Sequence, residues 1–256
     1  MLGIYLTAGH PDLETSKKAL RSLDDQGVEL IEIGVPFSDP LADGPVIQKS
    51  SFEALQNGVN LDVIFKLISE LRNEGTGSKE KIGLNNVILF SYFNPLFSYG
   101  FDNLIKKCKE TGIRGALIPD LPIEEAQELS VKFKEAGLDL ILLVAVTSTP
   151  ERIKKIAELS HPWIYLVSRT GVTGSKEDIQ NLQTHESSDE KLKSLIKEIK
   201  SHTNKQVAVG FGIDSKEKVV HTLSLGADMA IIGSKTVKLL AESGLGSFSK
   251  FIAELN

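Results

Sequence analysis

The sequence predicts an α/β protein that folds as a single (β/α)8 barrel, a TIM barrel, over residues 1–256, and three observations support this. Short apolar runs alternate with amphipathic segments along the whole chain. The runs are nearly continuous rather than alternately apolar and polar, as in strands that are covered on both faces of a parallel sheet. Eight such runs in 256 residues match the size of this barrel.

The eight predicted strands follow from these runs. Isoleucine, valine and leucine predominate in them, as expected for buried strands. The predicted strands are 3–7, 28–34, 86–91, 114–118, 138–144, 163–167, 206–210 and 228–232.

Helical patterns fill the intervals between the strands. Pro122 precedes one of them, and Gly112 and Gly137 follow two others, as start and stop signals do. Because each helix carries the chain back to begin another strand, the sheet should be parallel. The predicted helices are 13–26, 46–57, 61–74, 101–111, 123–136, 150–160, 189–203, 215–225 and 235–241.

A doubly wound open sheet is the alternative fold. It would more often have six strands and a glycine fingerprint after the first strand. The first loop here reads TAGHPD, which lacks that fingerprint.

No linker or low-complexity tract marks a boundary, so we expect one domain. Two polar stretches stand out: 73–86, a predicted surface excursion, and 174–191, a candidate lid after the sixth strand.

Composition and charge disfavour several classes of partner. The chain is 41% hydrophobic and 25% charged, with a formal net charge of −5 and no basic run, so nucleic acid and anionic membranes are poor candidates. No stretch approaches about eighteen apolar residues, and the N-terminus lacks signal-peptide features. The single cysteine, Cys108, lies in the polar context KKCKE and is expected on a helix surface. A cytoplasmic location fits these features.

Glu32 is an acidic residue inside an apolar run, IEIGV. It lies two residues before the end of the second predicted strand, where barrel enzymes place catalytic side chains. Burial would raise the pKa of this carboxylate and suit it to exchange protons near neutral pH. The structural alternative is a buried ion pair, but the predicted strands contain no lysine and only one arginine, Arg114.

Asp43 lies in the loop that follows, which also contains Asp39. Three prolines stiffen this loop because each fixes a backbone φ angle. A stiff loop could hold a carboxylate over the barrel mouth. The DGP sequence equally reads as a turn into a helix, so spacing alone leaves Asp43 open between turn-former and catalyst, while Asp39 fits a turn.

Glycine-bearing segments follow the late strands, where this fold usually binds phosphate. Gly212 lies in the loop after the seventh strand, and Gly233 and Ser234 follow the eighth. Their backbone amides and the Ser234 hydroxyl predict a phosphorylated ligand. No predicted strand carries a lysine for Schiff-base chemistry, and the five histidines are scattered, which disfavours a metal site.

Five segments resemble the tryptophan synthase alpha subunit family, in the same order and over essentially the whole chain. They are IEIGVPFSDPLADGPVIQ (31–48), SYFNPLFSYG (91–100), IPDLPIEE (118–125), YLVSRTGVTG (165–174) and GFGI (210–213). The resemblance implies the barrel and the retro-aldol cleavage of indole-3-glycerol phosphate to indole and D-glyceraldehyde 3-phosphate. It also implies a beta-subunit partner, with a tetramer of two alpha and two beta subunits. Pyridoxal phosphate is implied only in that partner, with no cofactor or metal in this chain.

The resemblance assigns roles to particular residues. Glu32 and Asp43 match the family's catalytic glutamate and aspartate. Glu32 would protonate indole C3 and then deprotonate the C3′ hydroxyl, while Asp43 accepts the indole N–H. The implied substrate-binding residues are Tyr5, Tyr92, Leu117, Tyr165, Thr173, Gly174, Phe211, Gly212, Gly233 and Ser234.

Some features depart from the family pattern, and rival functions remain open. His10 stands where many relatives carry an aspartate, and the sequence begins at its first predicted strand, without the family's short preceding helix. A free-standing lyase that releases indole without a partner is the nearest rival. A non-catalytic subunit that binds a phosphosugar, and another phosphate-binding barrel enzyme, are the others.

Overall fold

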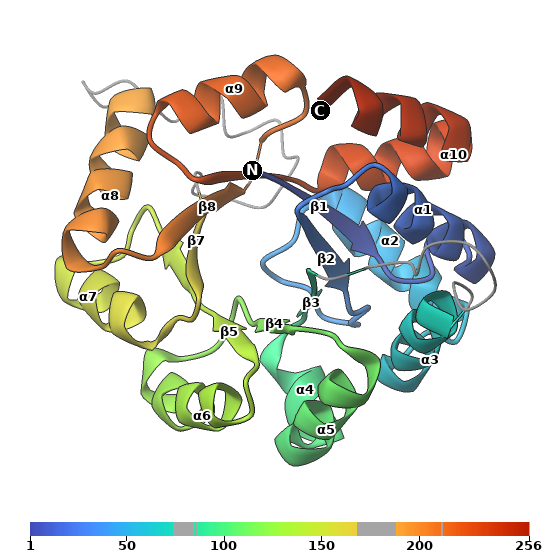
Figure 1. The fold of residues 1–256 in the computed structure, drawn as a ribbon, viewed down its shortest axis with the longest axis horizontal. Helices are drawn as coiled ribbons and strands as arrows, with labels where there is room; N and C mark the ends of the chain where they lie inside the picture. Colours follow the sequence, from blue (N-terminus) through green and yellow to red (C-terminus); the bar gives the residue numbers. More distant parts are fainter. Residues whose placement is uncertain (74–83, 85, 168–187, 211, 256) are drawn as a thin grey trace.

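The structure is a computed structural model that describes residues 1–73, 84, 86–167, 188–210 and 212–255. Its strands form one parallel sheet, and the helices make a ring outside it (Figure 1). The order β5-β4-β3-β2-β1-β9-β8-β7-β6 places the first and last strands of the chain side by side and confirms the predicted (β/α)8 barrel. The strands are β1 (Leu2–Thr7), β2 (Leu30–Gly34), β3 (Val87–Phe90), β4 (Gly115–Leu117), β5 (Asp139–Ile141), β6 (Leu143–Ala145), β7 (Trp163–Val167), β8 (Gln206–Gly210) and β9 (Met229–Ile232).

The predicted strand 138–144 is divided into β5 and β6, so the described residues contain nine strands rather than eight. β5 pairs with β4, and β6 pairs with β7. Leu142 lies between the two halves; its N–H donates to the Ser160 hydroxyl at 3.0 Å, and its carbonyl accepts from the Tyr165 N–H at 3.1 Å. β5 and β6 together therefore occupy the place of one barrel strand.

Two differences from the predicted helices concern α4 and α10. The segment of α4 was not predicted to be helical, and α10 continues well beyond residue 241 across a non-helical Gly244 (φ 74°). The helices are α1 (Leu13–Asp25), α2 (Pro45–Gln56), α3 (Leu61–Asn73), α4 (Phe93–Tyr99), α5 (Phe101–Thr111), α6 (Ile123–Glu135), α7 (Pro150–Leu159), α8 (Ser188–His202), α9 (Lys216–Ser224) and α10 (Ser234–Leu255).

The apolar core has two layers, because successive strand side chains point to opposite faces of the sheet. Ile31 and Ile33 belong to the outer layer, between the sheet and the helices. Leu30 belongs to the inner cluster, which is the set of strand side chains packed together inside the barrel. Tyr165 and its strand neighbours contribute to the same inner cluster. Glu32 is two positions beyond Leu30, so the alternation points its side chain into the barrel.

The prediction that Cys108 is a surface thiol is wrong. Cys108 is buried in α5, where it shares one helix face with Leu104 and Thr111. These residues are spaced as one turn of helix requires, and burial raises the pKa of the thiol to about 12. The polar neighbours in KKCKE lie on the other faces of the helix, so composition alone concealed the buried face.

The two polar stretches lie mostly outside the described residues. Only 73, 84 and 86 of the predicted excursion are described, and only 188–191 of the candidate lid, where they form the start of α8. The lid therefore remains a prediction.

Candidate active site

Glu32 lies in β2 with its side chain inside the barrel. It is 1% exposed, and neither carboxylate oxygen has a hydrogen-bond partner within the described residues. Burial raises the pKa of Glu32 to about 8. No described cation contacts it, which contradicts the buried ion pair for the part of the chain described. Glu32 is thus mostly protonated at neutral pH.

Asp43, in the loop between β2 and α2, is also buried but has a different environment. Burial raises the pKa of Asp43 to about 6, and a hydrogen bond from the Tyr92 hydroxyl to its Oδ2, at 3.0 Å, limits the rise. The same hydroxyl accepts a hydrogen bond from the Ala42 N–H at 2.9 Å. Asp43 is therefore mostly ionised at neutral pH, while Glu32 keeps its proton.

Hydrogen bonds to α2 and within the turn hold the loop that carries Asp43. The Phe37 N–H donates to the Ser51 oxygen at 2.7 Å, and the Ser51 hydroxyl donates to the Phe37 carbonyl at 3.0 Å. The Asp43 N–H donates to the Pro40 carbonyl at 3.0 Å, and the Gln48 amide donates to the Asp43 carbonyl at 2.9 Å. Asp43 is thus a turn residue whose carboxylate is also held by Tyr92.

Two buried tyrosines complete the inner face of the site. Tyr5 in β1 is the direct neighbour of Glu32 in the strand register, and Tyr165 lies in β7. Burial raises the pKa of both phenols well above the usual value, and the charges of Glu32 and Asp43 raise them further. Both tyrosines therefore stay protonated and lie close enough to both carboxylates to interact with their charges.

Glycines make room for the two tyrosine hydroxyls. A Cβ at Gly34 would overlap the Tyr5 hydroxyl oxygen, and one at Gly210 would overlap that of Tyr165. Any side chain at either position would displace the tyrosine. Sequence analysis did not single out these glycines, because glycine ends many strands.

An apolar wall adjoins these polar groups. The Phe90 ring lies edge-on to Tyr5, with 5.4 Å between ring centroids, and 6.4 Å from the ring of Tyr165. Leu117 is fully buried in the same inner cluster. The sequence analysis did not identify Phe90 as a site residue. Phe90 lies two positions after Ile88 in β3, and residues two apart in a strand share one face, so this spacing could have placed it inside the barrel.

The predicted phosphate residues adjoin the ends of β8 and β9. Gly212 has a left-handed backbone (φ 78°), and Gly233 directly precedes α10, which begins at Ser234. The Ser234 hydroxyl oxygen is buried and has no hydrogen-bond partner within the described residues. The backbone N–H groups of a helix N-terminus attract anions, so this end of α10 fits a phosphate.

Thr236 is a residue of this region that sequence analysis missed. Its hydroxyl oxygen lies 2.6 Å from the Gly233 carbonyl oxygen and 2.8 Å from that of Tyr5. It joins the first turn of α10 to β1, so it fixes the helix N-terminus relative to the tyrosine beside Glu32. Three other predicted site residues, Thr173, Gly174 and Phe211, lie outside the described residues.

The described part of the chain contains neither a cluster of metal ligands nor a helix that could span a membrane. No group of three or more His, Cys, Asp or Glu side chains there is arranged to hold a metal ion. None of the described helices combines the length and apolar character needed to cross a membrane.

A model of the family described as "Tryptophan synthase alpha chain" matches residues 2–253. The chain belongs to the tryptophan synthase alpha chain family. This family carries out the retro-aldol cleavage of indole-3-glycerol phosphate to indole and D-glyceraldehyde 3-phosphate, which makes the chain a carbon–carbon lyase of tryptophan biosynthesis.

Curated relatives are similar over nearly their whole length. The tryptophan synthase alpha chain of Thermosynechococcus vestitus is 42% identical over 253 residues, covering 98% of this chain and 89% of the relative. That of Synechocystis sp. is 43% identical over 255 residues, covering 98% and 90%.

Solved structures share the fold at comparable coverage. Tryptophan synthase from Mycobacterium tuberculosis matches with a TM-score of 0.84 and 31% identity, covering 99% of this chain and 90% of the other. The tryptophan synthase complex from Pyrococcus furiosus matches with a TM-score of 0.81 and 33% identity, covering 99% and 96%. The structural neighbours of this chain thus include one that was solved as a complex.

Proposed function

We propose that Glu32 and Asp43 are the catalytic residues with which this chain cleaves indole-3-glycerol phosphate. The observation that supports the proposal is that two buried carboxyl groups of the same site have different pKa values, so one is protonated and the other ionised at neutral pH. The pKa of Glu32 is raised to about 8 and that of Asp43 only to about 6. Two carboxyl groups with separated pKa values commonly take different roles in catalysis, one exchanging a proton and the other staying ionised.

Glu32 acts first as an acid. Indole is a poor carbanion leaving group, so C3 must gain a proton before its bond to C3′ breaks. The Glu32 carboxyl donates that proton, and the ring becomes an indolenine-like cation. Because Glu32 has no competing hydrogen-bond partner within the described residues, its proton is available to a substrate.

Glu32 then acts as a base. Its carboxylate takes the proton from the C3′ hydroxyl as the C3–C3′ bond breaks. The bonding electron pair returns to the indole ring, and C3′ becomes the aldehyde carbon of glyceraldehyde 3-phosphate. Asp43, ionised and held by Tyr92, accepts the indole N–H and stabilises the positive charge of the intermediate.

The remaining site residues bind the two ends of the substrate. The aromatic and aliphatic residues Tyr5, Phe90, Leu117 and Tyr165 provide an apolar surface for indole. Gly212, Gly233 and Ser234 bind the phosphate at the start of α10, where the unpartnered Ser234 hydroxyl supports the assignment. Thr173, Gly174 and Phe211 are proposed as further contacts from the family resemblance.

The proposed partner is a tryptophan synthase beta subunit, in a tetramer of two alpha and two beta subunits. Leu41, two residues before Asp43, is 83% exposed, and Phe97, in the helix that follows Tyr92, is 62% exposed. Exposed apolar side chains beside a catalytic loop are consistent with a protein interface. The beta subunit would carry pyridoxal phosphate and use the indole, whereas this chain needs no cofactor. A cytoplasmic location is consistent with a biosynthetic enzyme.

Substitution of each carboxylate tests the proposed roles. We expect Glu32→Gln and Asp43→Asn each to lower turnover of indole-3-glycerol phosphate by about 10²- to 10⁴-fold, since each removes a proton-transfer or charge-stabilising group. Asp39→Asn, a matched change at an exposed carboxylate of the same loop, should keep turnover within about twofold. Equal turnover of Glu32→Gln and Asp39→Asn would overturn the assignment.

A further inference from the structure

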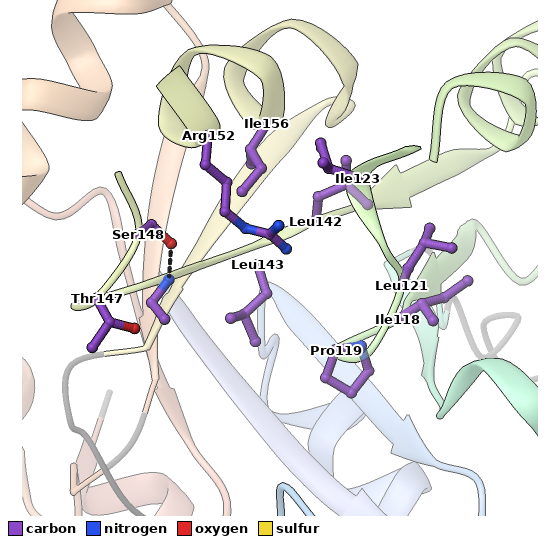
Figure 2. A pocket seen from close by; sticks show the side chains of 11 residues that line it. Ile118, Pro119, Leu121, Ile123, Leu142, Leu143, Thr147, Ser148, Arg152 and Ile156 are labelled. Carbon is purple, nitrogen blue, oxygen red and sulfur yellow. Dashed lines mark hydrogen bonds between the residues drawn. The ribbon is translucent and has the colours of Figure 1, made fainter. Parts of the chain in front are cut away.

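A cavity of about 310 Å³ opens at the barrel rim, beside the proposed active site but not formed by its residues (Figure 2). Its walls come from the segment after β4, the start of α6, β6 and the start of α7. None of the residues assigned above to catalysis, indole or phosphate lines it. Leu143 separates the two regions, because it lines the cavity and also packs against the inner cluster.

Most of the residues that line the cavity are aliphatic, although polar atoms make up the larger part of its exposed surface. Ile118, Leu121, Ile123, Leu142 and Ile156 line it, and all five are buried in the core. Pockets of this size with apolar walls and a few placed polar groups are the usual form of small-molecule sites. The cavity therefore offers a small apolar wall, enough for a short alkyl group, beside a larger polar surface.

A cation that has no partner among the described residues lies over these walls. Figure 2 shows the Arg152 side chain extending from α7 toward Leu142 and Leu143. Arg152 is exposed at the mouth of the cavity, and its guanidinium makes no ion pair or hydrogen bond within the described residues. A free guanidinium offers several N–H donors in a fork that matches a carboxylate.

Two hydroxyl groups lie on the same side of the cavity as Arg152 and form a polar edge with it. The Ser148 oxygen accepts a hydrogen bond from the Ala145 N–H at 3.1 Å, so its own proton is available to a ligand (Figure 2). Thr147 lines the cavity next to it. The polar edge thus offers donors and a positive charge, with no carboxylate among the residues that line the cavity.

We propose that this cavity is a second ligand site that binds a small carboxylate with an apolar body. The carboxylate accepts hydrogen bonds from the Arg152 guanidinium and the Ser148 hydroxyl. The apolar body lies against Ile118, Ile123 and Ile156. This site is separate from the one proposed for indole-3-glycerol phosphate, although the two share Leu143 as a wall.

Titration with 4-methylpentanoate, followed by NMR of isoleucine methyl groups, tests the proposal on the full chain. Saturable shifts are expected at Ile118, Ile123 and Ile156. The neutral isostere 4-methylpentanamide should bind at least about tenfold more weakly, because a charge-assisted hydrogen bond is lost. Arg152→Met should weaken binding of the acid by a similar factor, and Arg152→Lys should lose less because it keeps the charge.

A matched variant and a competition experiment make the test selective. Lys155→Met removes an exposed cation from the same helix and should leave affinity within about twofold. Glu32→Gln should bind 4-methylpentanoate as the unmodified chain does, and saturating indole-3-glycerol phosphate should not displace it from that variant. Because no turnover is needed, failure of the proposed catalytic roles would not affect this result.

Three results would overturn the proposal. One is the absence of saturable shifts at these methyl groups up to about 10 mM, a concentration above the weakest affinity of interest. Another is equal affinity for the acid and the amide, or for Arg152→Met and the unmodified chain. The third is displacement by indole-3-glycerol phosphate, which would make the cavity part of the substrate site.

Discussion

At the scale of single residues, the environment of each carboxylate determines its protonation state. Glu32 is surrounded by apolar groups and has no described hydrogen-bond partner, so burial acts unopposed on its pKa. Asp43 is also buried but accepts a hydrogen bond from Tyr92, which stabilises the ionised form. The hydrogen bond from Tyr92 and the less complete burial of Asp43 thus distinguish its protonation state from that of Glu32.

Tyr92→Phe tests this distinction through the pH dependence of kcat/KM. Asp43 must be ionised to act, so activity falls as pH drops through its pKa of about 6. Removal of the hydrogen bond that lowers this pKa should move the acidic limb upward by up to about one pH unit. The alkaline limb, where Glu32 loses its proton near pH 8, should not move.

A second tyrosine provides the control for this measurement. The Tyr99 hydroxyl donates to Asp62 at 2.6 Å, an exposed pair that involves neither Glu32 nor Asp43. Tyr99→Phe should leave both limbs in place. An acidic limb that stays unchanged in Tyr92→Phe would contradict the proposed role of the hydrogen bond.

The sequence alone indicated individual site residues, but it did not indicate which distant segments contact one another at the site. The isolated Glu32 in an apolar strand and the proline-rich loop around Asp43 were visible as patterns. Phe90 and Thr236 were not, because their importance depends on which strand face or helix end meets a distant segment. Such contacts join residues far apart in the sequence, and local patterns do not specify them.

At the scale of secondary structure, unpaired backbone groups at element ends are satisfied by side chains. The Lys205 ammonium donates to the carbonyls of Ala157 at 2.7 Å, Glu158 at 3.1 Å and Ser160 at 2.6 Å. These carbonyls lie at or just beyond the end of α7, where intrahelical donors are lacking. The lysine therefore joins the start of β8 to that helix end.

Lys205→Met should lower the free energy of unfolding by about 1–3 kcal/mol, since it leaves these carbonyls without their charged donor. Lys197→Met, at an exposed lysine of α8, is the matched change and should have an effect within about 0.5 kcal/mol. Urea denaturation followed by circular dichroism measures both. Equal stability of the two variants would show that the helix end does not depend on Lys205.

The ends of some strands and helices follow from local sequence signals, whereas others are set by contacts with distant segments. The strands 163–167 and 206–210 have their predicted bounds, because apolar runs and turn residues coincide there. The division at Leu142 was not predictable, since it reflects a change of pairing partner within one apolar run. The last helix was predicted to end at residue 241, yet α10 continues past Gly244, and Phe248 and Ile252 beyond it are fully buried against the core.

At the scale of the whole molecule, we propose that residues 1–256 form one domain. The chain ends are packed into the same structure: β1 pairs with β9, and the Ser22 and Ser249 hydroxyl oxygens, from α1 and α10, lie 2.8 Å apart. The pairing of β1 with β9 thus places the two ends of the chain inside one sheet, as expected for a single folding unit.

Phe248→Ala tests the single domain. Phe248 is fully buried, so truncation should lower the free energy of unfolding by about 3–5 kcal/mol. Unfolding should remain a single transition, with circular dichroism and the fluorescence of Trp163, the only tryptophan, changing together. Phe97→Ala, at an exposed side chain, is the control. Transitions that separate between the two probes would indicate more than one unit.

The most direct measurement of the central claim is indole release from indole-3-glycerol phosphate. It compares the purified chain alone, the chain with a tryptophan synthase beta subunit, and Glu32→Gln under both conditions. We expect slow release by the chain alone, a sharp rise with the beta subunit, and loss of release in Glu32→Gln. Fast release that the partner does not change would indicate a free-standing lyase. Undiminished release by Glu32→Gln, or none from the correctly folded unmodified chain, would contradict the proposed proton transfer by Glu32.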